Sequence, residues 1–147
     1  MDELFSEIKQ LEKLIDAKSQ GYVQECEMKL AKICCYHDPR IIKEFAVLFS
    51  DDCEDDLMWS IIHCIEDFED EVYVENVLSV LPIIYEKSPM WASILIIRIT
   101  NNPNSLICLK RCLSRMQDKQ RVLGVATYTA NKWREQASAI KEVFQIS

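Results

Sequence analysis

Glycine is scarce in this sequence of 147 residues, which has only two, together with four prolines. Folds rich in short strands and tight turns use glycine and proline at those turns, so their scarcity disfavours a turn-rich β fold. Apolar residues make up 49% of the chain, a share too high for a disordered protein. With so few helix breakers present, the composition predicts an all-α fold.

The sequence also lacks the motifs of the common enzyme classes. Two glycines cannot supply a phosphate-binding glycine loop, and there is no HExxH and no GxSxG pattern. The two histidines, His37 and His63, lie in no recognisable catalytic setting. We therefore expect a protein that is not an enzyme.

Patterns for metal ions are incomplete. Residues 34–37 (CCYH) could form half of a zinc site, but the paired CxxC spacing is missing. A calcium loop starting at Asp52 would need glycine at its sixth position and glutamate at its twelfth, where this chain has Leu57 and His63. We expect no metal and no cofactor.

Long apolar runs are missing as well. The richest run, Trp91 to Ile97, is far shorter than the roughly 18 to 20 residues of a membrane span, and Arg98 follows it. The sequence opens on charged residues rather than on a basic and then apolar leader, which predicts no secretory signal. We therefore expect a cytoplasmic protein with no membrane partner, whose seven cysteines are reduced.

Apolar residues recur at helical spacing along the whole chain. The pattern predicts about eight helices joined by turns of about two to six residues, which makes sequence neighbours antiparallel. Asp55 or Asp56 is expected to cap the fourth helix, and Asn104 or Ser105 the seventh. The expected ranges are 2–18, 22–37, 39–49, 57–68, 70–87, 90–100, 106–116 and 118–144. The last is expected to bend around Gly124, Thr127 and Thr129, before residues 133–144.

Short turns between helices favour stacked pairs within a single domain covering residues 1–147. Such stacking is typical of a short α-solenoid of the HEAT type. No fixed-period repeat is present, so an irregular helical bundle remains the alternative.

Positive charge is absent from the middle of the chain, where no Lys or Arg lies between Lys43 and Lys87. Residues 44–86 carry 13 acidic groups and no basic one, whereas residues 87–147 carry 10 basic and 3 acidic groups. The net charge of −7 therefore conceals a polarised molecule. We expect the central carboxylates to have no cation partners and to create a strong local field.

The carboxylates gather at residues 51–56, the first acidic cluster, and at residues 66–71, the second acidic cluster. A helix of about 11 residues, roughly 16 Å long, separates them, so they should lie at its opposite ends. Both clusters could instead be solvent-exposed surface with no binding role, and Trp59 could belong to the core. We favour the second cluster, with Trp59 and His63, as a contact surface. The candidate partner-binding residues are Asp51, Asp52, Glu54, Asp55, Asp56, Trp59, His63, Glu66, Asp67, Glu69, Asp70 and Glu71.

Basic residues concentrate near the end of the seventh expected helix, between Lys110 and Arg121. Cations at a helix C-terminus complement the helix dipole. A nucleic-acid surface is disfavoured because the acidic middle of the chain repels phosphate and no aromatic residues alternate with these cations. We expect no direct binding of nucleic acid.

The segment from residue 59 to residue 112 resembles the all-helical immunity protein 30 family. The matching features are the acidic stretch, SIIHCIE at residues 60–66, LP at 81–82, SPxWA at 88–92 and RIxN at 98–101. The resemblance implies an antidote that binds and neutralises a cognate bacterial toxin of the contact-dependent growth inhibition type, and we expect a basic nuclease. An acidic surface could then occupy the cleft in which the nuclease attracts phosphate. The alternative is a helical scaffold or adaptor that binds a basic protein.

Overall fold

The computed structural model describes residues 3–147, so the helix start expected at Asp2 lies outside the described residues. Within that range there are nine α-helices, one short 3-10 helix and no strand, which confirms the all-α fold. The elements are α1 (Glu3–Ala17), α2 (Tyr22–Cys34), α3 (Arg40–Glu44), η1 (Phe45–Leu48), α4 (Asp55–Glu66), α5 (Asp70–Lys87), α6 (Pro89–Asn101), α7 (Pro103–Arg115), α8 (Gln120–Lys132) and α9 (Ala137–Phe144).

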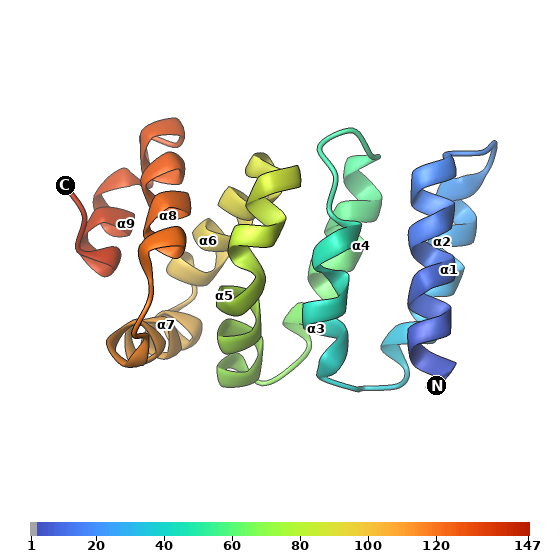
Figure 1. Ribbon diagram of the computed structural model, residues 1–147, viewed down its shortest axis with the longest axis horizontal. Helices are drawn as coiled ribbons and strands as arrows, with labels where there is room; N and C mark the ends of the chain where they lie inside the picture. Colours follow the sequence, from blue (N-terminus) through green and yellow to red (C-terminus); the bar gives the residue numbers. More distant parts are fainter. Residues whose placement is uncertain (1–2) are drawn as a thin grey trace.

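The helices stand in pairs along the longest axis of the molecule, from α1 and α2 at one end to α8 and α9 at the other (Figure 1). α1 packs on α2, α2 on α4, α3 on α5, and α6 on α8. Each pair thus contacts mainly the pairs next to it, as in a short α-solenoid. α5 lies at the centre of the row and contacts α3, α4, α6, α7 and α8.

The core follows the apolar spacing of the central helices. In α5, Val74, Val77, Leu81 and Ile84 recur every three or four residues and are fully buried or nearly so. This spacing places them along one face of the helix, in the apolar core cluster that also includes buried residues of α4 and α6. The second acidic cluster lies at the corner where α4 ends and α5 begins.

The last helical region divides at a different point from the one predicted. α8 continues through Gly124 to Lys132, and the break falls at residues 133–136, before α9. A glycine inside a helix costs only about 1 kcal/mol. The buried face of α8, which includes Val125 and Ala126, holds the helix together across that position. The predicted bend at Gly124 was therefore wrong.

Two predicted helix caps were also wrong. α4 begins at Asp55, so Asp55 and Asp56 lie in its first turn, and Glu54 at the N-cap makes no side-chain capping bond. α7 is capped by Asn102, whose Oδ1 accepts hydrogen bonds from the backbone N–H groups two and three residues later, at 3.0 and 3.2 Å. Pro103 at the first helical position starts α7 earlier than expected, because its missing N–H costs nothing there.

A disulfide between Cys34 and Cys64 joins the last turn of α2 to α4. The expectation that all seven cysteines are reduced was therefore wrong for this pair. The two residues are 30 positions apart in sequence, but packing of α2 on α4 brings their Cα atoms to 6.1 Å, a distance that a disulfide can bridge.

Crossing a membrane requires a helix that is both long and apolar, and no helix within residues 3–147 meets both conditions.

Candidate partner-binding site

The two acidic clusters lie at opposite ends of α4, as the sequence predicted. α4 has 12 residues and is therefore about 18 Å long. The first cluster precedes it and fills its first turn, and the second follows its last turn. A surface of this protein that binds a partner could therefore be centred on either cluster.

Much of the first acidic cluster supports local structure. Asp55 and Asp56 in the first turn of α4 complement the positive end of the helix dipole. The Asp52 carbonyl accepts a hydrogen bond from Lys18 Nζ at 3.1 Å. Burial raises the pKa of Asp51, while backbone N–H groups at the start of α6 oppose that effect. The Lys18 bond leaves the Asp52 carboxylate unoccupied, and all five acidic residues of the cluster are exposed and form no ion pair within residues 3–147.

Glu66 in the second acidic cluster has a cation partner that the sequence did not suggest. Arg98 of α6 donates from Nε to Glu66 Oε2 at 2.6 Å and from a terminal nitrogen to Oε1 at 2.8 Å. Glu71 lies at 3.5 Å from Arg111 and 3.9 Å from Arg115, both exposed on α7. The expectation that these carboxylates have no cation partners was wrong for these two, because the solenoid brings later basic helices against the corner.

Three carboxylates of the second acidic cluster remain without a cation. Asp67, Glu69 and Asp70 form no ion pair within residues 3–147; the first two are exposed and Asp70 is half-buried. They occupy the turn between α4 and α5 and the first residue of α5. This corner therefore retains its negative charge after the local ion pairs have formed.

Trp59 is half-buried and supports Arg98. Its ring packs edge-on against Trp91 with 5.4 Å between ring centres. The guanidinium carbon of Arg98 lies 5.2 Å from the centre of the Trp59 ring, so Arg98 is held by both the ring and Glu66. His63 is 65% exposed, and its Nδ1 lies 3.7 Å from Glu66 Oε1. A contact role for Trp59 and His63 stays a prediction.

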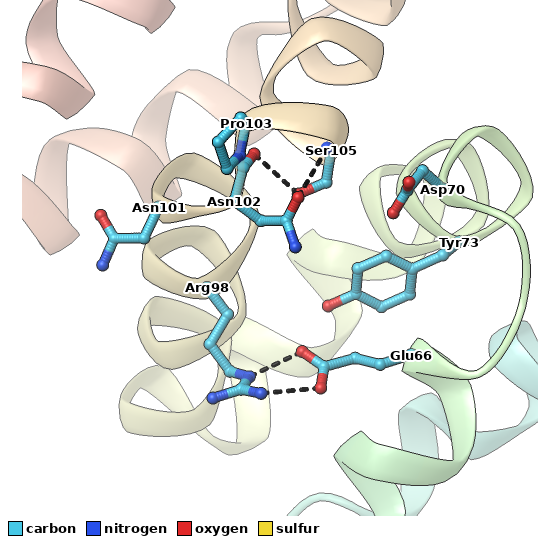
Figure 2. A pocket seen from close by; sticks show the side chains of 8 residues that line it. All are labelled: Glu66, Asp70, Tyr73, Arg98, Asn101, Asn102, Pro103 and Ser105. Carbon is cyan, nitrogen blue, oxygen red and sulfur yellow. Dashed lines mark hydrogen bonds and ion pairs between the residues drawn. The ribbon is translucent and has the colours of Figure 1, made fainter.

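A cleft of about 500 Å³ opens beside the second acidic cluster (Figure 2). The end of α4, the start of α5 and the corner between α6 and α7 form its walls. We call it the Tyr73 cleft. The residues that line it are Glu66, Asp70, Tyr73, Arg98, Asn101, Asn102, Pro103 and Ser105.

Tyr73 is the wall residue that sequence reasoning missed. It is only 4% exposed, and its hydroxyl forms no hydrogen bond within the described part of the chain. Burial raises the pKa of the phenol, and the neighbouring Glu66 carboxylate adds to that effect. The hydroxyl is therefore neutral and can both donate and accept. Tyr73 stands between Val72 and Val74 in α5, a setting that gave no signal of a polar role.

His63 and Asp67 line a separate groove between α2 and α4. It measures about 400 Å³, and the Cys34–Cys64 disulfide and Phe68 form part of its wall. Four of the predicted contact residues thus line two depressions, with Glu66 and Asp70 in one and His63 and Asp67 in the other. Within residues 3–147, no group of three or more histidine, cysteine or acidic side chains could hold a metal ion.

Comparison with known proteins identifies the family. The model for immunity protein 30 matches residues 9–109, more than half of the chain, and extends well beyond the segment in which the sequence features were noted. No curated protein and no solved structure matches. The matched range includes both acidic clusters, Tyr73 and Arg98, and ends before α8. Membership implies a cognate toxin as the partner. The chain therefore belongs to the immunity protein 30 family.

Proposed function

We propose that this immunity protein neutralises a basic toxin domain, a nuclease, by covering its active site with the second acidic cluster. The observation that carries the proposal is the set of three carboxylates, Asp67, Glu69 and Asp70, that have no cation partner within residues 3–147 and lie at the corner where the Tyr73 cleft opens. An active site that binds a nucleic acid presents positive charge to attract phosphate. Carboxylates can compete for the same field.

The second acidic cluster is the better of the two candidate surfaces. In the first cluster, Asp55 and Asp56 lie in the first turn of α4, and Asp51 lies beside backbone N–H groups at the start of α6. The second is rimmed by two depressions that could receive side chains of a partner, which the first cluster lacks among the pockets lined by described residues. Anchors inserted into such depressions commonly dominate the free energy of binding.

Charge reversal at the corner tests the surface. The variant carries Asp67→Lys and Glu69→Lys, both at exposed positions outside the helices. The matched control carries Asp16→Lys and Glu25→Lys, which make the same charge change on exposed residues of α1 and α2. Association with the cognate toxin domain is measured by stopped flow at low and high salt.

The corner variant should associate about 10-fold or more slowly than the control at low salt, and the difference should shrink as salt screens the field. Cells that express the toxin should lose protection with the corner variant and keep it with the control. Equal association rates for the two variants would overturn the proposed surface.

A separate measurement tests active-site occlusion. A short nucleic acid bound to a catalytically inactive toxin should compete with the immunity protein, and the wild-type protein should abolish cleavage by the active toxin. Simultaneous binding of both would contradict occlusion. A scaffold or adaptor, the alternative function, would bind its partner without protecting cells from the toxin.

A further inference from the structure

The Tyr73 cleft contains a buried hydroxyl, that of Tyr73, which has no hydrogen-bond partner within residues 3–147. Folded proteins almost always pair their buried hydroxyls, and an exception calls for an explanation. The Tyr73 hydroxyl points toward Arg98 and Glu66 and lies close enough for the Glu66 carboxylate to raise the pKa of the phenol, yet no atom of the described residues meets it with hydrogen-bond geometry (Figure 2). A ligand atom placed in the cleft could accept from this hydroxyl or donate to it.

The neighbouring charges decide which kind of group the cleft receives. Arg98 is already bound at two nitrogens by both oxygens of Glu66, so the two charges offset each other. Asp70 lines the same cleft and has no cation partner within residues 3–147. The formal charge of the cleft is therefore −1, which favours a cation over an anion.

We propose that the Tyr73 cleft is the socket for one basic side chain, a lysine or an arginine, that the toxin inserts on binding. Asp70 forms the ion pair with it, and the Tyr73 oxygen accepts one of its N–H hydrogen bonds. Glu66 supplies a further acceptor site, because each carboxylate oxygen can accept more than the one bond it makes with Arg98. This proposal rests on the proposed function, which it deepens by naming the anchor and its receptor.

Tyr73→Phe is the most specific test because it removes only the hydroxyl. Loss of a hydrogen bond to a charged group should weaken toxin binding by about 10- to 100-fold. The isolated protein should unfold at the same urea concentration as the wild type or a higher one, since the hydroxyl makes no hydrogen bond in the free protein. Tyr85→Phe, a half-buried tyrosine farther along α5, is the control and should leave binding unchanged.

Asp70→Asn should weaken binding by about 10-fold or more, because the cation loses its counter-charge. Wild-type affinity in both Tyr73→Phe and Asp70→Asn would overturn the socket. If the charge reversal of Asp67 and Glu69 still slowed association in that case, the acidic surface would stand without the socket. The socket and the acidic surface can therefore be refuted independently of each other.

A titration without toxin tests the chemistry of the cleft directly. N-acetyl-lysine methylamide, a cationic probe, should shift the backbone amide resonances of Asp70 and Asn102 in the wild-type protein. The shifts should disappear in Asp70→Asn, and acetate should produce none in the wild type. Equal shifts with acetate, equal shifts in Asp70→Asn, or no shift with the cation would each overturn the proposal.

Discussion

Replacing Arg98 and Glu66, singly and together, measures how firmly the ion pair holds the corner of the candidate site. Arg98→Met keeps most of the side-chain volume against Trp59 and removes the charge. Glu66→Gln keeps the shape of the acceptor and removes its charge. The double variant completes a cycle that isolates the coupling between the two charges.

The geometry sets the expected magnitude. The two hydrogen bonds are 2.6 and 2.8 Å long, while the Arg98 and Glu66 side chains are 35% and 24% exposed. Fully exposed ion pairs contribute about 0.2–1 kcal/mol, and breaking a buried one costs about 3–5 kcal/mol. This pair lies between those limits, so we expect a coupling of about 1–2 kcal/mol.

The coupling is read from urea unfolding of the four proteins, with midpoints followed by circular dichroism. Arg98→Met should be the more costly single change, because it leaves a half-buried carboxylate without a cation. For a domain of this size its thermal midpoint should fall by roughly 2–8 °C. A coupling below about 0.5 kcal/mol would show that solvent screens the pair and that the pair does not hold the corner.

Three further predictions concern stability alone. Hydrogen bonds from two lysines of α2 lower the pKa of Glu7 below its ordinary 4.5. The stability that ionised Glu7 contributes is therefore complete above pH 4.5 and is lost as pH falls through the lower pKa of the folded protein. Urea midpoints measured over a pH series should show this loss in the wild type, and Glu7→Gln should reduce it. Reducing the Cys34–Cys64 disulfide should lower the free energy of unfolding by about 2–4 kcal/mol, and equal urea midpoints with and without reductant would contradict this. Asn102→Ala should lower the free energy of unfolding by about 1 kcal/mol, because it removes the side chain that caps α7. Asn104→Ala is the control and should leave the free energy of unfolding unchanged.

The helical architecture was readable from the sequence because apolar spacing decides which face of each helix is buried. Val74, Val77, Leu81 and Ile84 show this in α5, where the predicted and observed helix limits agree. The balance between the helix propensity of a residue and the packing of its helix was harder to judge. Gly124 has a low helix propensity, yet the packed face of α8 outweighs it.

The site was only half predictable. The second acidic cluster was visible because its carboxylates are contiguous in sequence. Its partner Arg98 was not, because 32 residues separate it from Glu66 and only the stacking of helices brings them together. Tyr73 could not be found at all, since an unpaired buried hydroxyl is a property of the packed structure. The disulfide was missed for the same reason, because it depends on how α2 packs against α4.

Hydrogen exchange of the complex shows directly whether the toxin binds at the corner of α4 and α5. Amide exchange is followed by mass spectrometry in the free protein and in the presence of the toxin domain. Exchange should be slower in the complex at residues 66–73 and 98–105, and it should be unchanged in α1, α8 and α9. Slower exchange confined to α8 and α9, or to the first acidic cluster, would contradict it.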